Sequence, residues 1–220
     1  MRPTRRDLLR ATLGIGAAAT TRAAWAEAPR EPTPSQTIGP FYPVTRPLDA
    51  DADLTVIEGG AGYAEGQVIH VMGRVLDARG APVAGARVEI WQANAKGRYA
   101  HPADRNPAPL DPNFQGFGAQ LTDGDGQYRF KTIKPAAYPI NPMNPERVRP
   151  PHIHFDVSGR DARLVTQMYF PGDPDNAGDL IFGGLGADEQ RAVTASVSPP
   201  GAGLAPDSLL VRWDIVLGGG

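Results

Sequence analysis

Two histidines separated by a single residue carry the clearest chemical signal in the sequence. His152 and His154 flank Ile153 in a short apolar run. Side chains alternate between the two faces of a β-strand, so both imidazoles are expected on one face while Ile153 and Phe155 point into the core. Two imidazoles on one face can bind one metal ion. The alternative is a hydrogen-bonded or surface pair without a metal.

Any further ligands of such a metal must be oxygen or nitrogen atoms, because the chain contains no cysteine. This composition excludes disulfides, thiolate-bound zinc, iron–sulfur clusters and a thiolate nucleophile. Of the other two histidines, His70 lies in an apolar stretch and is expected to be structural, whereas His101 lies in a loop and can support a site. No histidine follows His154, which argues against a cupin site. A zinc or copper protein that uses His152 and His154 remains one hypothesis.

The elements that must position these groups are short strands separated by turns. The chain has 26 glycines and 23 prolines among 220 residues, which disfavours long helices. Only residues 187–193 have a helical pattern. Apolar runs bounded by Gly, Pro and Asp predict strands at residues 68–76, 86–93, 118–122, 128–133, 152–158, 164–170 and 209–217. The sequence therefore predicts an all-β fold, a β-sandwich with long Pro/Gly-rich loops and little helix.

Two long, proline-rich connections interrupt this pattern, at residues 97–117 and 134–151. Loops of this length in a compact domain are usually either functional or disordered. Each contains a tyrosine among other apolar residues, Tyr99 in the first and Tyr138 in the second. We therefore expect ordered loops that contribute to a site.

The N-terminal 26 residues have the features of an export signal. Arg5 and Arg6 precede a weakly apolar stretch, and an A-x-A cleavage signal ends at Ala26. The apolar stretch is too short for a membrane anchor. The hypothesis is a twin-arginine signal peptide at 1–26, an extended Pro-rich arm at 27–66 and one β-sandwich domain at 67–220. We expect export to the periplasm or the medium; the alternative is a cytosolic protein with a basic N-terminus.

The charge balance bears on the kind of partner. Removing the first 26 residues, with five Arg and one Asp, takes the formal net charge from −2 to −6. An acidic chain without clustered Lys and Arg is not expected to bind nucleic acid, because phosphate binding requires basic side chains. No run of like charge indicates a membrane surface.

Several motifs in order resemble the intradiol ring-cleavage dioxygenases, most closely the protocatechuate 3,4-dioxygenase type. The resemblance extends from Pro34 to Leu217. Several motifs in the right order are more specific than any one of them. The matching segments are residues 33–42 (TPSQTIGPFY), 91–99 (WQANAKGRY), 110–114 (LDPNF), 122–126 (TDGDG), 134–139 (KPAAYP), 149–154 (RPPHIH), 167–170 (QMYF) and 172–174 (GDP).

The resemblance implies a non-haem Fe(III) centre with the ligands Tyr99, Tyr138, His152 and His154. It implies an enzyme that uses O2 to cleave a catechol-type ring between its two hydroxyl-bearing carbons, giving a cis,cis-muconate. Arg149 matches the family's active-site arginine, and Gln167 matches a polar residue near the iron. Tyr138 matches the tyrosine that the substrate displaces. Ferric iron is a hard cation that favours anionic oxygen donors, which suits phenolates.

The sequence departs from this family in ways that leave the substrate open. Ile140 stands where protocatechuate enzymes tend to have an aromatic residue. Those enzymes build their pocket from two related chains, whereas this sequence is a single chain; a homo-oligomer is one hypothesis, and pairing with a partner subunit is the alternative. The alternative from another class is a transthyretin-like β-sandwich binding module, suggested by the strand–turn–strand pattern of residues 73–90.

Overall fold

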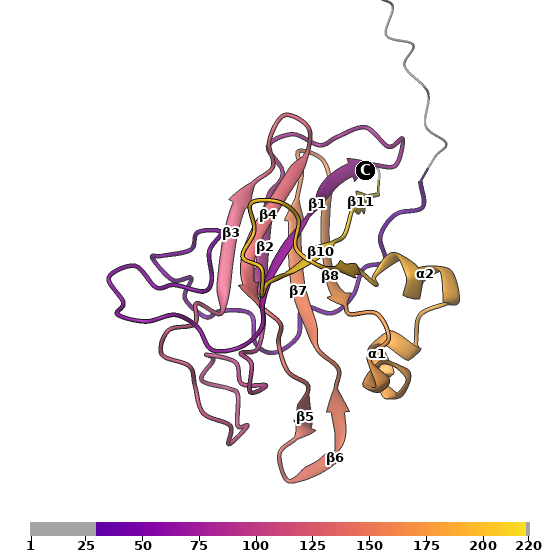
Figure 1. The fold of residues 1–220 in the computed structure, drawn as a ribbon. Coiled ribbons are helices and arrows are strands. Elements are labelled where there is room, and N and C mark those ends of the chain that lie inside the picture. Colours follow the sequence, from indigo (N-terminus) through magenta and orange to yellow (C-terminus); the bar gives the residue numbers. More distant parts are fainter. Residues whose placement is uncertain (1–29, 219–220) are drawn as a thin grey trace, which may run out of the picture.

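Two β-sheets pack face to face and enclose the apolar core in the computed structural model, which describes residues 30–218 (Figure 1). The proposed signal peptide at 1–26 lies outside the described residues. In the first sheet, β1 pairs with β10 along its first half and with β11 along its last residues, β4 also pairs with β1, and β9 pairs with β10. The strands of this sheet are β1 (Val68–Asp77), β4 (Gln127–Ile133), β9 (Ser196–Ser198), β10 (Leu209–Arg212) and β11 (Ile215–Leu217).

The second sheet carries the histidines on one of its two inner strands. Its order is β3-β2-β7-β8, and all neighbours are antiparallel. The strands are β2 (Arg87–Trp91), β3 (Phe117–Leu121), β7 (His152–Ser158) and β8 (Arg163–Tyr169). Ile153, Phe155 and Val157 of β7 are fully buried against the first sheet, as alternation predicts. The prediction of an all-β sandwich is therefore confirmed, and every predicted strand except the last is present within about two residues of its expected bounds.

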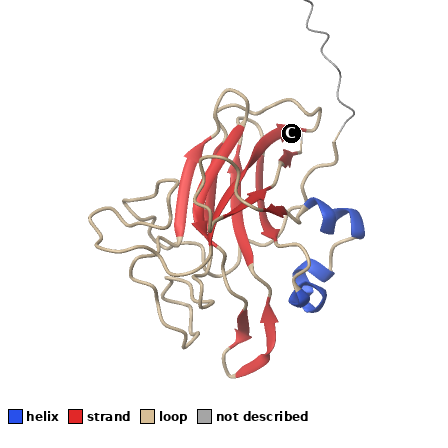
Figure 2. Cartoon of the chain, viewed as in Figure 1, coloured by secondary structure: helices blue, strands red, loops and turns tan. Residues whose placement is uncertain are grey.

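Two predicted segments differ from the structure. Residues 209–217 were expected to form one strand, but Trp213 and Asp214 separate β10 from β11. These two residues still form hydrogen bonds to β1: the Trp213 amide donates to the Met72 carbonyl, and the Asp214 side chain accepts from the Arg74 amide. Residues 134–151 were expected to form an ordered loop without strands, yet they contain the hairpin of β5 (Tyr138–Asn141) and β6 (Asn144–Arg149), which projects from one end of the sandwich (Figure 2).

Within residues 30–218, helical structure is confined to short segments beside β8 (Figure 2). The predicted helix at 187–193 is present as α2 (Ala187–Ala192), whereas the 3₁₀ segment η1 (Pro174–Gly178) and helix α1 (Leu180–Gly183) were not predicted. Each of these two is only about a turn long, too short for a periodic apolar pattern to appear in the sequence. No helix among residues 30–218 has the length and apolarity needed to cross a membrane.

The Pro-rich segment before β1 runs along the sandwich and is tied to it at several points. The Thr33 amide donates to the Val216 carbonyl, and the Gln36 amide donates to the Val165 carbonyl. Leu54 is fully buried in the core between the sheets. The segment therefore spans from the edge of one sheet to the core, and it brings residues 37–42 to the end of the second sheet where the histidines lie.

Gly73 in the middle of β1 is required by the close approach of the interrupted β10–β11 segment. A Cβ atom at this position would lie 1.7 Å from the backbone oxygen of Trp213. That oxygen also accepts a hydrogen bond of 2.6 Å from the Tyr128 hydroxyl in the core, so it is held in place.

We expect Gly73→Ala to lower the free energy of unfolding by about 3 kcal/mol, because the added methyl displaces held backbone. Gly124→Ala is the matched control: it lies in the β3–β4 turn with nothing within 4 Å of the added Cβ. Its effect should stay within about 0.5 kcal/mol. Chemical denaturation of both variants checks this, and equal stability of the two would contradict the packing constraint.

Candidate metal centre

Four side chains from three parts of the chain meet at the end of the second sheet. The ring centroids of His152 and His154 lie 4.9 Å apart, and those of Tyr99 and Tyr138 lie 5.5 Å apart. Tyr138 is 5.7 Å from His152, and Tyr99 is 6.2 Å from His154, measured between ring centroids. The structure thus brings together all four residues named as iron ligands, and that role stays a prediction.

His152 is held in the tautomer that leaves its outer nitrogen free to bind a metal. Its Nδ1 lies 2.6 Å from the Pro150 carbonyl oxygen, which can only accept, so Nδ1 carries the proton. The lone pair is therefore on Nε2, 3.4 Å from the Tyr99 hydroxyl. Burial and the charge of Arg149 lower the pKa of His152 to about 3, so the ring is neutral at neutral pH.

His154 lies between the plane of a tryptophan and the N-terminal arm. Trp91, its cross-strand neighbour on β2, stacks on the imidazole at 4.8 Å and 8°. Gly39 lies on the arm at φ +71°, and a Cβ there would be 3.2 Å from His154 Cε1. The His154 Nδ1 atom is buried with no hydrogen-bond partner among the described residues. Burial lowers the pKa of His154 well below its usual value, so this ring too is a neutral donor.

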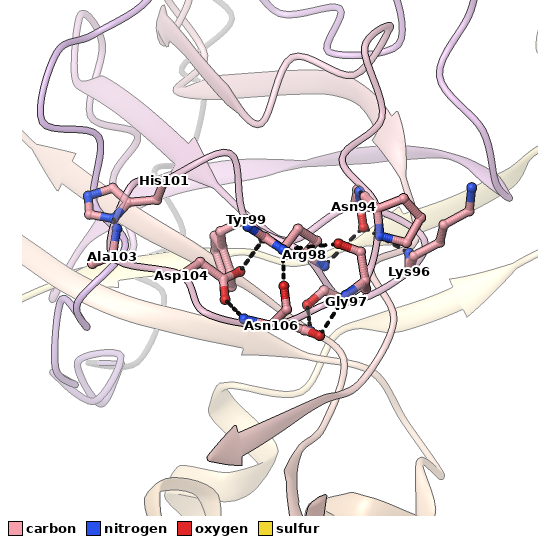
Figure 3. Close-up of polar contacts among 11 residues, drawn as sticks. Asn94, Lys96, Gly97, Arg98, Tyr99, His101, Ala103, Asp104 and Asn106 are labelled. Atoms are coloured by element: carbon pink, nitrogen blue, oxygen red, sulfur yellow. Dashed lines mark hydrogen bonds and ion pairs between the residues drawn. The ribbon is translucent and has the colours of Figure 1, made fainter. Parts of the chain in front are cut away.

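Tyr99 is positioned by a polar network inside the loop that follows β2 (Figure 3). Its amide donates to the buried carboxylate of Asp104 at 2.7 Å, and the Asn106 amide donates to the other oxygen at 2.8 Å. The Asn94 side-chain oxygen accepts from the amide of Arg98 at 2.9 Å, which closes the turn before Tyr99. The loop is therefore ordered by its own side chains, as its length and composition predict.

The two tyrosine-bearing segments touch at a glycine. Gly97 has φ +76°, and a Cβ there would lie 2.5 Å from the Ala137 carbonyl oxygen and 3.1 Å from Tyr138 Cβ. Only a residue without a side chain allows this approach and this backbone conformation. The contact places Tyr138, at the start of β5, against the loop of Tyr99.

Both phenols are buried, and neither ionises at neutral pH by itself. Burial raises the pKa of Tyr99 well above its usual value and also raises that of Tyr138, while Arg149 opposes the shift at Tyr138. A bound cation reverses this balance, because its charge favours the phenolate. The pair is therefore suited to a strongly charged metal ion.

The two tyrosines and two histidines suit ferric iron better than they suit a metal ion bound only by histidines or carboxylates. Among residues 30–218, no group of three or more His, Asp or Glu side chains is placed to hold a metal. The side chains of Tyr99 and Tyr138 lie beside the two imidazoles and offer phenol oxygens to a metal there. Two phenols and two neutral imidazoles suit a hard trivalent cation.

Arg149 lies beside this cluster, held by three side chains. It pairs with Tyr138 in the β5–β6 register. Its Nη2 donates to Gln167 Oε1 at 2.6 Å and to the Tyr169 hydroxyl at 3.3 Å, and its Nε donates to Asp179 at 3.0 Å. Gln167 and Arg149, both named from the sequence, are therefore in direct contact.

Other residues near the cluster carried no signal in the sequence. Asp104 and Asp179 are single carboxylates in loops, and nothing in their spacing marks them. The two remaining histidines lie apart from the four donors: His101 packs 5.8 Å from Phe41 through its ring, while His70 is buried on β1. Ile140 is half-exposed on the hairpin, two residues beyond Tyr138.

Comparisons with known proteins agree with this geometry. A sequence model of the family described as "Dioxygenase" matches residues 38–219. The protocatechuate 3,4-dioxygenase beta chain of Burkholderia cepacia is 54% identical over 140 residues, which are 63% of this chain and 58% of that one. The hydroxyquinol 1,2-dioxygenase of Rhizobium sp. (strain MTP-10005) is 35% identical over 175 residues, covering 73% of this chain and 56% of that protein.

Comparison with solved structures also finds dioxygenases. The dioxygenase domain of a dioxygenase carbohydrate-binding protein fusion from Streptomyces sp. SirexAA-E matches with a TM-score of 0.64 and 27% identity, over 86% of this chain and all of that one. The chain spans a little under three fifths of the length of the first two curated relatives that it matches. The match over residues 38–219 covers most of the chain, which therefore belongs to the intradiol ring-cleavage dioxygenase family.

Proposed function

We propose that this protein is an intradiol dioxygenase that binds non-haem Fe(III) through Tyr99, Tyr138, His152 and His154. Its substrates are O2 and a catechol-type aromatic diol, and a protocatechuate-like compound is the first candidate. The observation that carries the proposal is the meeting of two buried phenols and two neutral imidazoles in a chain of this family. A binding module of the transthyretin-like kind has no need for such a donor set.

The overall reaction needs no added reductant. Both atoms of O2 enter the product while the bond between the two hydroxyl-bearing carbons breaks, so a catechol and O2 balance with a cis,cis-muconate and two protons. When bound, ferric iron supplies a Lewis acid that can also accept electron density from the diol. The protein must bind the diol, take up its protons and stabilise negative charge on the ring.

Tyr138 is the donor best placed to take up a substrate proton. Its exposed fraction is 8%, against 1–3% for Tyr99, His152 and His154, so it is the least enclosed of the four. It lies at the base of the β5–β6 hairpin, outside the second sheet. We infer that the diol displaces Tyr138 and that the Tyr138 oxygen receives the proton, because Tyr138 matches the tyrosine that the substrate displaces in this family.

Arg149 stabilises negative charge that develops on the ring. Burial lowers its pKa, but Tyr138 and Asp179 more than compensate and raise it above the usual value, so the guanidinium stays charged. A fixed cation in a buried site acts strongly, because little water screens it. Gln167 holds the guanidinium through the 2.6 Å hydrogen bond.

The first test is turnover with three diols. Iron-loaded protein should absorb visible light through tyrosinate-to-iron charge transfer, and it should consume O2 with catechol, protocatechuate or hydroxyquinol and form a muconate without added reductant. An oxygen electrode and product absorbance measure this. A colourless protein that takes up no iron would exclude the proposal, binding of zinc or copper alone would favour the two-histidine metal protein, and a yellow semialdehyde product would indicate extradiol cleavage.

A second test separates the two tyrosines from other phenols. Tyr99→Phe and Tyr138→Phe each remove one oxygen donor, so each should shift or weaken the visible band, and activity should fall by ~10²-fold or more. Tyr63→Phe is the matched control, since Tyr63 is largely exposed and outside the cluster. An unchanged band in either cluster variant removes that residue from the ligand set.

We also propose that the protein is exported by the twin-arginine route and acts in the periplasm or outside the cell. The support is the Arg5-Arg6 pair, the short apolar stretch and the Ala24-Trp25-Ala26 cleavage signal. A homo-oligomer stays a prediction. Neither a nucleic-acid partner nor a stable membrane anchor is part of the proposal.

Export can be tested by fractionating cells. Replacing Arg5 and Arg6 together with lysine should leave the protein in the cytoplasm, because the export machinery reads the arginine pair. Arg10→Lys is the control and should leave export intact. Equal periplasmic amounts of the paired variant and the parent would contradict the twin-arginine route.

A further inference from the structure

The charge of Arg149 reaches every donor of the candidate metal centre. It acts electrostatically on Tyr99, Tyr138, His152 and His154. The Coulomb energy of such an effect depends on the distance between the charges, so the position of the guanidinium matters as well as its presence. An arginine side chain has many rotamers, so a single position of the guanidinium requires partners that hold it.

Asp179 is the only carboxylate that the structure places against this guanidinium among the described residues. Its Oδ2 accepts from Arg149 Nε at 3.0 Å, and the side chains are 11% and 1% exposed for Arg149 and Asp179. A pair this deeply buried is screened little by solvent. The contact joins residues 30 positions apart, from the end of β6 to the junction of η1 and α1.

The carboxylate is itself fixed in orientation. Its other oxygen, Oδ1, accepts from the Ile181 amide at 3.0 Å, and its own amide donates to the Asn176 carbonyl. With one oxygen held by the backbone, the second must face Arg149. The junction of η1 and α1 therefore holds the Asp179 carboxylate in the orientation that accepts from Arg149.

A second side chain, Gln167, holds another nitrogen of the guanidinium. Gln167 Nε2 donates to the Thr37 carbonyl of the N-terminal arm at 3.2 Å, which turns Oε1 toward Arg149. Gln167 and the Tyr169 hydroxyl accept from Nη2 and Asp179 accepts from Nε, so hydrogen bonds at two nitrogens orient the guanidinium.

We propose that Asp179 is a positioning residue that orients the Arg149 guanidinium toward the reacting diol. This inference rests on the proposed dioxygenase function. Among the described residues, Arg149 is the side chain that Asp179 hydrogen-bonds, and Asp179 makes no hydrogen bond to the four ring donors.

Asp179→Asn tests the inference because it keeps the oxygen that caps Ile181 and removes the charge that holds Arg149. We expect kcat with catechol to fall by ~10-fold or more while KM changes little, because the lost interaction stabilises developing charge. Iron content and the tyrosinate band should match the parent. Catechol affinity, measured by anaerobic spectral titration, should also change little.

Asp173→Asn is the matched control. Asp173 caps the neighbouring segment η1 in the same way, through the Asp175 amide, and is not in contact with Arg149. We expect parental kcat from this variant. Thermal unfolding of both variants shows whether capping alone accounts for any difference, since each keeps its capping oxygen.

A double-mutant cycle decides whether Asp179 acts through Arg149. The Arg149→Ala/Asp179→Asn variant should have the kcat of Arg149→Ala alone, because no guanidinium remains to be oriented. This variant also avoids an unpaired buried guanidinium, so it keeps the test open if Asp179→Asn fails to fold. The inference is overturned, and the proposed function is not, if the fold-losses in kcat of the two single variants multiply in the double variant. The same holds if the parent is active and Asp179→Asn leaves its kcat unchanged. A parent protein with no O2 uptake on any diol would overturn the proposed function as well.

Discussion

The alternation of side chains along β7 is the constraint on which the site depends. β7 is paired on both edges within the second sheet, and the side chains on both of its faces are buried as far as Val157. Ile153, Phe155 and Val157 fill one face and pack against the first sheet. His152 and His154 therefore have no alternative but the other face, where burial keeps both imidazoles neutral. The same strand that closes the core thus presents two metal donors in a fixed relation.

The cross-strand neighbours of β7 complete the surroundings of the histidines. Trp91 on β2 and Gln167 on β8 both pair with His154, while Tyr169 on β8 pairs with His152. Their side chains lie on the same face as the imidazoles because antiparallel partners directly opposite each other share a face. The stacking of Trp91 on His154 and the placement of Gln167 and Tyr169 beside the histidines are therefore consequences of sheet register.

The remaining parts come from segments that the sheets do not dictate. The loop of Tyr99, the hairpin of Tyr138 and Arg149, and the arm of Gly39 converge on one end of β7. Glycines allow this convergence where backbones approach closely, at Gly97 and Gly39. Buried polar groups in these segments are satisfied by specific partners, such as Asp104 for the Tyr99 amide.

The sandwich, the strand positions and the shared face of His152 and His154 could all be predicted from the residues, because period-two alternation and turn residues are local properties. Tyr99 and Tyr138 were named as ligands only through the resemblance to a family, since loop tyrosines carry no periodic signal. The β5–β6 hairpin escaped prediction because its proline content argues against strands, yet its register places Tyr138 opposite Arg149.

By itself, the sequence determined which groups were available: no thiolate, a histidine pair on one strand face, two loop tyrosines and an arginine three residues before the histidines. Only the tertiary structure decided how these groups meet and what holds them. The partnership of Arg149 with Asp179 spans 30 residues and joins a hairpin to a helix junction. Such a contact depends on the packing of separate elements, and no local pattern of residues encodes it.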